Sequence, residues 1–296
     1  YKNLKTQGLI IQIIKNNKPI NKIKQSDKAI IVTNQTSFYG ESGGQIGDTG
    51  VIKFNNNKFK VLDTKKILKM HLHYGEVIKG QFKKNETVNL IVDSKKRQRV
   101  KIYHSATHLL HASLRKILGT NVTQKGSLVS FDRLRFDFSY SKPISDIDIK
   151  KIENVANKII KKNEKVNISI MAYKKAVEKG AMALFGEKYE DEVRVVSMGK
   201  EENKPIFSME LCGGTHVNKT SEINDIKIIK QSSVASGIRR VEALSGNDLS
   251  NYIKAEKEII FVREKEKKNK KEREKLDEKK KIDFLEDPSK NILIEG

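Results

Sequence analysis

The chain has 296 residues, 32% of them charged and 37% hydrophobic, and its 59 Lys and Arg outnumber its 37 Asp and Glu to give a formal net charge of +22. Its single Cys excludes an internal disulfide framework and points to a reducing compartment, and no run approaches the ~20 apolar residues that a membrane span needs. The length suits two domains with their own cores. The positive charge favours a polyanionic partner such as nucleic acid, although abundant Lys, Asn and Ile are also typical of an A/T-rich coding sequence.

The first 93 residues indicate strands joined by turns. Apolar residues alternate with polar ones or form short β-branched runs, and clusters such as Asn55–Asn57 interrupt them. We expect strands at Leu9–Ile14, Ala29–Val32, Val51–Phe54, Lys58–Leu62 and Val88–Val92. A small β-barrel over residues 1–93 is the economical arrangement of these strands.

The next segment has the pattern of a long amphipathic helix. From Ile102 to Leu118 apolar residues recur at i, i+3, i+4 and i+7, and Gly119 is a stop signal. His104 and His108 are four residues apart, so they lie on one helical face where a single cation could reach both. A hydrogen-bonded helix surface is the alternative. His111 lies nearly on the same face, and spacing alone does not exclude it as a ligand.

Helix and strand patterns then mix without strict βαβ alternation. Ser145 precedes an acidic first turn and indicates the start of a second amphipathic helix, Ser145–Lys162. We expect strands at Ser127–Val129, Leu134–Phe138, Val166–Ile170, Val193–Met198 and Ile226–Ile229. This mixture predicts an α+β domain over residues 94–247.

The thiol of the chain lies in the segment Glu210–His216. Two glycines separate Cys212 from His216 and predict a tight loop that folds both side chains back toward one ion. Together with the helix, this loop offers three imidazoles and a thiolate, the donor set that tetrahedral Zn²⁺ prefers. A free Cys alone is more often a small buried apolar residue. The conjunction of the two segments makes a metal site the leading hypothesis.

From Asp248 onward the chain predicts one charged helix. Residues 254–281 hold 13 Lys or Arg against 8 Asp or Glu, so most of the net charge lies in the rest of the protein. The mixed spacing of Glu and Lys favours a solvated single helix or a coiled-coil arm over residues 248–296, and a partly disordered extension fits the pattern as well.

Six segments stand in the order seen in alanyl-tRNA synthetases. They are Thr36–Gln45, His104–His108, Gln124–Leu128, Leu134–Phe138, Glu210–His216 and Gly237–Ala243. Over residues 8–246 the chain resembles the editing region of that family and its free-standing AlaX relatives. The resemblance implies an α+β fold: a β-barrel, an editing domain of the threonyl/alanyl-tRNA synthetase second-additional-domain type, and a charged helix that starts the C-terminal region.

The same resemblance predicts a fragment of a longer enzyme. No segment resembles the ATP-using class II aminoacylation core, which lies upstream in the family, and the chain opens at Tyr1 without Met. We therefore expect that the N-terminus and any targeting peptide are missing, which leaves a cytoplasmic or an organellar location open.

The resemblance implies hydrolysis of the ester that joins serine or glycine to the 3′ end of tRNA(Ala). A pocket sized for alanine rejects glycine and serine poorly, so a second, hydrolytic site is needed. In the family zinc is held at positions that match His104, His108, Cys212 and His216, which leaves His111 as a packing residue. Because four protein ligands fill a tetrahedral shell, we favour a metal that positions and polarises the substrate over one that only generates hydroxide.

Three polar residues are candidates for catalysis. Thr36 matches a family position associated with the serine hydroxyl, Gln124 matches a position linked to editing, and Gln45 ends a Gly-Gly-Gln turn suited to approach the tRNA terminus. Their ordinary alternatives are a strand Thr, a Gln that faces solvent and a simple turn. These three residues favour an enzyme over a zinc-stabilised tRNA-binding module without editing activity.

Three basic residues are candidates for tRNA binding. Arg239 and Arg240 offer guanidinium groups that match phosphate oxygens, and Lys125 follows Gln124 in its motif. Pairing of one Arg with Glu242 in a surface salt bridge is the alternative. Editing by a threonyl-tRNA synthetase shares the helix and Cys loop but fits the Gly-Gly-Gln segment less well. The sequence indicates neither a membrane nor another protein partner.

Overall fold

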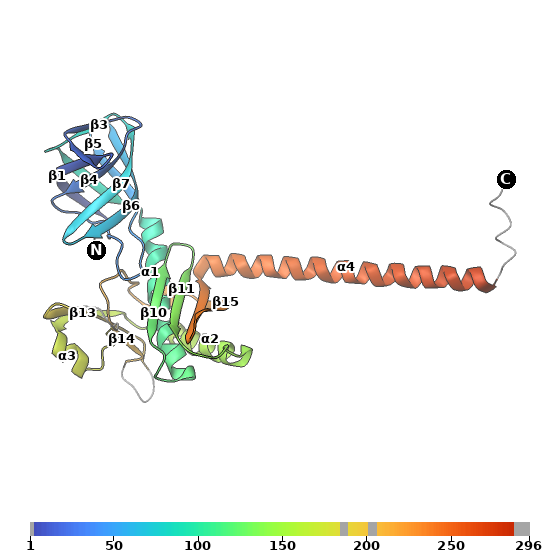
Figure 1. Ribbon diagram of the computed structural model, residues 1–296. Helices are drawn as coiled ribbons and strands as arrows, with labels where there is room; N and C mark the ends of the chain where they lie inside the picture. The colour runs from blue at the N-terminus through green and yellow to red at the C-terminus, as the bar shows by residue number, and fades with distance from the viewer. Residues whose placement is uncertain (1–2, 184–188, 201–205, 287–296) are drawn as a thin grey trace, which may run out of the picture. The chain divides into compact units, whose positions relative to one another are not determined.

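The structure, a computed structural model, describes residues 3–183, 189–200 and 206–286. The chain divides into two compact units, Tyr1–Asp248 and Leu249–Gly296. The first unit contains an N-terminal barrel of antiparallel strands and a part in which helices pack on sheets (Figure 1). The predicted α+β class is therefore confirmed, whereas the boundary at residue 93 stays a prediction.

The barrel closes because its first long strand pairs with its last. The antiparallel ring runs β1, β4, β7, β6, β5, β9 and back to β1, while β2 pairs with β1, and β3 pairs with β8. Alternate side chains such as Ile13, Ile52 and Phe59 fill its core. The strands are β1 (Lys5–Lys15), β2 (Lys18–Ile20), β3 (Lys22–Lys24), β4 (Lys28–Thr33), β5 (Gly50–Phe54), β6 (Asn57–Ile67), β7 (Met70–Lys79), β8 (Gln81–Lys83) and β9 (Thr87–Val92).

The second part of this unit packs two sheets with helices. The sheets have the orders β10-β11-β16-β15 and β12-β13-β14. The elements are α1 (Ser94–Leu118), β10 (Gln124–Val129), β11 (Leu134–Ser139), α2 (Asp146–Lys161), β12 (Asn167–Ala172), α3 (Tyr173–Glu178), β13 (Glu192–Met198), β14 (Ser208–Leu211), the 3₁₀ helix η1 (Thr220–Ile223), β15 (Ile226–Ala235) and β16 (Ile238–Ser245).

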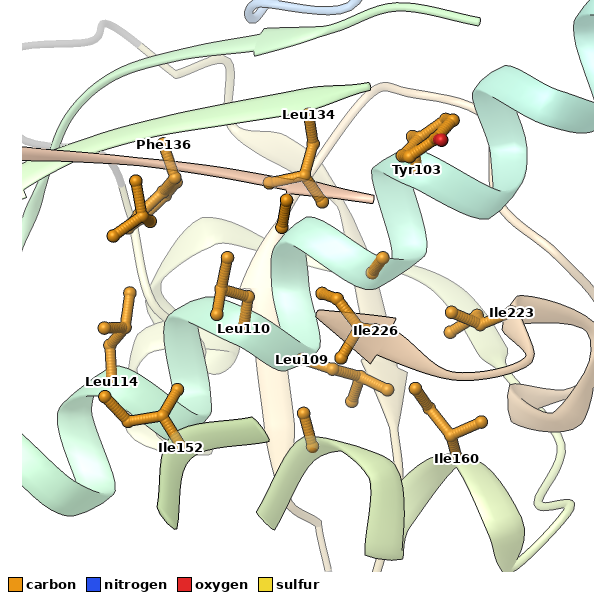
Figure 2. Close-up of a cluster of buried hydrophobic side chains, with 14 of the residues drawn as sticks. Tyr103, Leu109, Leu110, Leu114, Leu134, Phe136, Ile152, Ile160, Ile223 and Ile226 are labelled. Carbon is orange, nitrogen blue, oxygen red and sulfur yellow. The ribbon is translucent and has the colours of Figure 1, made fainter. Parts of the chain in front are cut away.

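Helix α1 is the central element of this part. Asp93 caps its N-terminus by accepting hydrogen bonds from the N–H groups of Lys95 and Lys96, and Gly119, with φ 112°, ends it as predicted. Figure 2 shows its leucines, among them Leu110 and Leu114, between apolar side chains of the β11 strand and of α2. This packing holds the His-bearing face of α1 in place.

Several elements extend beyond their sequence signals. Helix α1 begins at Ser94, eight residues before Ile102, where the apolar pattern starts. The pattern misses this segment because the first two turns of the helix are mostly basic. Strands β7 and β16 were not expected at all. The histidines and Glu76 of β7 mask its alternation, and Arg239, Arg240 and Glu242 do the same in β16. The Ser145 cap of α2 matches the prediction, since its Oγ accepts from the N–H of Asp148 at 3.1 Å.

The charged C-terminal helix is confirmed as α4 (Gly246–Glu286). Every residue of this helix from Lys257 to Ile282 is exposed. The last ten residues of the predicted extension lie outside the described residues. Within the described ranges, no helix combines the length and the apolar character that crossing a membrane requires.

Candidate metal centre

The four predicted metal ligands lie together. His104 and His108 face the loop after β14, which carries Cys212 and His216, and one donor atom from each of the four residues lies within 4.8 Å of the others. Cys212 Sγ is 3.4 Å from His104 Nε2 and 3.3 Å from His216 Nε2. Ideal Zn–S and Zn–N bonds at a tetrahedral angle separate sulfur from nitrogen by about 3.5 Å. The donor types and their spacing therefore fit a zinc ion.

His104 and His216 turn their Nε2 atoms toward the cluster because hydrogen bonds hold their Nδ1 atoms. Gln45 Oε1 lies 2.6 Å from His104 Nδ1 and also accepts from the N–H of Thr215 at 2.9 Å, which fixes this atom as the amide oxygen. His216 Nδ1 lies 3.1 Å from Ser105 Oγ. Contacts of this kind orient metal-binding imidazoles and set their tautomers.

Glu210 lies between the two remaining histidines. Its Oε1 is 3.2 Å from His111 Nδ1, with which it forms a hydrogen bond, and its Oε2 is 3.4 Å from His108 Nδ1, where the hydrogen-bond angle is poor. Burial acts to raise the pKa of Glu210, but the neighbouring His108 and His111 hold it below its usual value. A carboxylate therefore faces His108 on the side away from the cluster.

His111 is not part of the donor group. Its ring packs against Phe136 with the centroids 4.9 Å apart, and its Nδ1 faces Glu210. The structure thus places it where the family resemblance implies, behind the candidate ligands and against the core.

The surroundings of the three candidate histidine ligands favour their neutral form. Burial lowers the pKa of His104 and His216 well below the usual value, and the charges of neighbouring histidines and Arg194 act in the same direction. Burial also lowers the pKa of His108, against the opposing charge of Glu210. Imidazole must be unprotonated to bind a metal, so this environment prepares the three rings as ligands.

One glycine of the Cys loop is required by close packing. A Cβ atom at Gly214 would overlap the ring of His104 and approach Gln45 Oε1 at 2.8 Å. Gly213 has open space around it. The tight loop predicted from the two glycines therefore depends mainly on Gly214, whose backbone lies against the His104 ring.

Three of the four candidate ligands, His104, His108 and Cys212, line a pocket of about 510 Å³. The loop after β4, the β6–β7 hairpin, α1, β10, β13 and the Cys loop all contribute to its lining. The lining includes Ser42, Lys66, His104, Gln124, Arg194 and Cys212. Polar and charged side chains therefore surround an open space beside the candidate ligands, as a binding site requires.

The three predicted catalytic residues take different positions. Gln124 lines the pocket, where its amide donates to Ser127 Oγ at 3.3 Å. Gln45 is fully buried and contacts His104 and Thr215 instead of the pocket. Thr36 follows β4 and is also absent from the described lining, with its Oγ1 2.9 Å from His73 Nε2. Of the three, only Gln124 faces the space beside the metal ligands.

The predicted phosphate ligands have partners on the protein. Arg240 pairs with Asp137 through two hydrogen bonds of 2.7 and 2.8 Å, and Arg239 donates to Gln231 Oε1 at 3.3 Å. The alternative to phosphate binding was a salt bridge of one Arg with Glu242. The structure instead pairs Arg240 with Asp137. Lys125 is exposed on β10. Their contact with phosphate stays a prediction.

Arg194 is a functional candidate that the sequence analysis missed. It lies on β13, donates to the backbone oxygen of Cys212 at 2.5 Å and lines the pocket. Ser105, Glu210 and Thr215 belong to the sequence motifs, but the motifs do not predict that Ser105 contacts His216, that Glu210 faces His108, or that Thr215 bonds to Gln45. A charged residue between Val193 and Val195 in an otherwise apolar strand is the sequence feature that could have indicated a functional role for Arg194.

A buried ion pair holds the barrel loop against α1. Arg97, 1% exposed, pairs with Asp48 and donates to the backbone oxygen of Ser37 at 2.9 Å. Asp48 also accepts from the N–H of Tyr39 at 2.5 Å. The loop that supplies Gln45 and part of the pocket lining is therefore tied to the helix that bears His104.

Comparisons with known proteins agree with the motifs. Residues 1–96 match the family model for tRNA synthetases class II (A), and residues 193–242 match the threonyl and alanyl tRNA synthetase second additional domain. The chain is 48% identical over 258 residues to an alanine–tRNA ligase of Chelativorans sp. (strain BNC1), covering 86% of this chain and 29% of the relative. It is 43% identical over 263 residues to that of Parvibaculum lavamentivorans, covering 88% and 30%. The predicted resemblance is confirmed, and the chain spans less than a third of either relative.

Proposed function

Since this chain is related to alanyl-tRNA synthetases, we propose that it performs the proofreading reaction of that family. The reaction is hydrolysis of the ester between serine or glycine and the 3′ end of tRNA(Ala). The full-length protein would be an alanine–tRNA ligase. The observation that carries the proposal is the position of His104, His108 and Cys212 in the wall of a polar pocket, where a bound ester would contact them.

The donor set supports zinc as the metal, held by His104, His108, Cys212 and His216. A bound zinc ion supplies Lewis-acid polarisation of oxygen atoms. The exposed side of the site is the Cys212 side, because the three imidazoles are each no more than 6% exposed while Cys212 is partly accessible. Substrate therefore approaches past the Cys loop.

The residues around the pocket have distinct proposed roles. Gln124 orients the ester or the attacking water through its amide, which can donate and accept. Arg194 brings a positive charge to the side of the pocket where negative charge develops on the ester oxygen. Gln45 acts as a positioning residue through its bond to His104.

The remaining candidates depend more on the resemblance. Thr36 donates to His73, because His73 Nδ1 faces the backbone oxygen of Ile31 at 2.8 Å and leaves Nε2 as an acceptor. Its Oγ1 also accepts from the N–H of Phe38, which leaves one lone pair. Thr36 lies outside the described pocket lining, so a role toward the serine hydroxyl follows from the family resemblance alone. Contact of Lys125, Arg239 and Arg240 with tRNA phosphates completes the proposal.

A metal-stabilised tRNA-binding module is the second candidate. The observation that favours it is the complete set of four protein donors, three of them buried, because a closed shell of protein ligands is typical of structural zinc sites. The same set would also be present in the enzyme, so the donors alone do not separate the two functions. Turnover does.

The deciding experiment measures deacylation of serine-charged and glycine-charged tRNA(Ala) by this chain, with alanine-charged tRNA(Ala) as the control substrate. We expect hydrolysis of the first two and little of the third. A Gln124→Ala variant should keep its metal and lose most of its rate, whereas Cys212→Ala should lose both. A metal-loaded, tRNA-binding chain with no turnover would leave the binding module as the function, and full activity of metal-free Cys212→Ala would exclude a role for the metal in the reaction.

A further inference from the structure

The turn between β6 and β7 has an unusual composition. Leu68 and Lys69 form this two-residue turn, and Leu68 has a φ of +55° and is 85% exposed. A positive φ is unfavourable for a residue with a Cβ, and hairpin turns normally place Gly or Asn there. The other described non-glycine residues with positive φ are all Asn or Ser: Asn16, Asn17, Ser26, Asn55, Asn85, Asn163 and Asn224. Leu68 is the aliphatic exception.

The exposed Leu has apolar and basic neighbours. Ile67 and Met70 lie directly opposite each other in the β6–β7 register and are 50% and 49% exposed. Lys65, Lys66 and Lys69 surround them in sequence. We call residues 65–70 the hairpin tip. An exposed apolar cluster that folding does not require indicates a contact with another molecule.

The hairpin tip adjoins the pocket beside the metal ligands. Lys66 lines this pocket together with Ser42. Gly40 packs so closely that a Cβ there would lie 3.0 Å from the backbone nitrogen of Lys66, and Glu41 pairs with Lys65 at 3.8 Å. Through Lys65 and Lys66 the hairpin tip is thus fixed to the loop that forms part of the lining, and the apolar residues of the tip follow directly after the pocket-lining Lys66.

We propose that the hairpin tip binds the single-stranded 3′ end of the tRNA next to the aminoacylated nucleotide. Leu68, Ile67 and Met70 pack against base faces, and the lysines contact the adjoining phosphates. This assignment rests on the proposed function, because it takes the pocket as the site of the ester. The combination of apolar faces with positive charge fits single-stranded RNA, which presents base faces and phosphates together.

The test compares three variants of the whole chain. Leu68→Asn removes the apolar side chain with a residue that the chain itself uses at positive φ, and Leu68→Met keeps an apolar side chain of similar length. Ile147→Thr is the matched control, since Ile147 is 67% exposed on α2 and is not among the pocket-lining residues. The measurements are kcat and KM for serine-charged tRNA(Ala), direct binding of uncharged tRNA by fluorescence anisotropy, and Tm.

For Leu68→Asn we expect KM and the tRNA Kd to rise about fivefold or more, because the burial of an apolar side chain against a base is lost, with kcat little changed. Tm should be equal or higher, because the strained Leu is gone. Leu68→Met should restore most of the affinity. Unchanged tRNA affinity in Leu68→Asn would overturn the proposal, as would an equal loss in Ile147→Thr. If the wild-type chain binds tRNA without turnover, the proposed function fails while the anisotropy comparison still decides the role of the tip.

Discussion

Gln45, from the N-terminal barrel, accepts a hydrogen bond from Nδ1 of His104 on α1 at 2.6 Å. The two residues are 59 positions apart in sequence, and the Gln45 side chain is fully buried. Because the same oxygen accepts from the backbone of Thr215, one carboxamide fixes both a candidate ligand on the helix and the loop that carries two others. A loop of the barrel domain therefore contributes a residue that orients a ligand of the candidate metal centre.

This relationship predicts that Gln45→Ala weakens metal binding while the barrel stays folded. The change leaves the Nδ1–H of His104 and the N–H of Thr215 buried without an acceptor, so the ring is no longer held in its orientation. We expect metal affinity to fall about 10- to 100-fold, measured by competition with a chromogenic chelator. Gln35→Ala is the control, since Gln35 donates to Gln7 in an exposed part of the same barrel. Equal metal affinity in both variants would contradict the assigned role.

The donor group predicts different outcomes for two neighbouring histidines. His108→Ala should lose the metal, because it removes one of four donors that lie within 4.8 Å of one another. His111→Phe should keep one metal ion per chain, because this ring packs on Phe136 and phenylalanine preserves that contact. Metal analysis of the purified variants checks both outcomes. Loss of the metal from His111→Phe with an unchanged Tm would mean that His111 is itself a ligand.

The four residues of the candidate metal-binding group could be predicted, but the contacts that orient them could not. Helical spacing brings His104 and His108 together, and the two glycines bend the loop around Cys212. The partners of the ligands come from remote segments: Gln45 from the barrel and Glu210 from β14. The sequence pattern does not predict these side-chain contacts, because they depend on how the barrel and the β14 strand pack against α1. Thr36 shows the same limit, because its bond to His73 depends on the unpredicted strand β7.

The buried ion pair predicts a large stability loss in Arg97→Met. The variant leaves the carboxylate of Asp48, only 6% exposed, without its charge partner. Breaking a buried pair on one side costs about 3–5 kcal/mol, and urea unfolding measures it. Lys151→Ala removes an exposed pair with Asp148 of 3.5 Å, and its effect should stay within about 0.5 kcal/mol. Similar losses in the two variants would show that Arg97 contributes no more than a surface charge.

The environment of His73 predicts a stability loss in mild acid. Burial lowers the pKa of His73 from 6.5 to about 4, against the opposing hydrogen bond to Ile31. Between these values the unfolded chain takes up a proton that the folded chain does not, so the free energy of unfolding falls as pH decreases from 6.5 toward 4. The difference between these two pKa values corresponds to a loss of about 3 kcal/mol in the free energy of unfolding. His73→Gln should flatten the profile in this range when both proteins hold the same metal content. Parallel profiles would assign the acid sensitivity to other groups.

Phosphate contacts predict that tRNA binding weakens as salt increases, and that Lys125→Ala and Arg240→Ala differ in their effect on stability. Each lost phosphate contact lowers the slope of log K against log salt by about 0.7–0.9. Lys125→Ala should show this change with no loss of stability, because Lys125 is exposed. Arg240→Ala should lower the slope and also lower Tm, since Asp137, with a side chain 9% exposed, loses its two-point partner. Filter binding between low and physiological salt measures the slopes. A flat response of the wild-type chain would remove phosphate contacts from the proposed tRNA interface, and an unchanged slope in Lys125→Ala would exclude that residue.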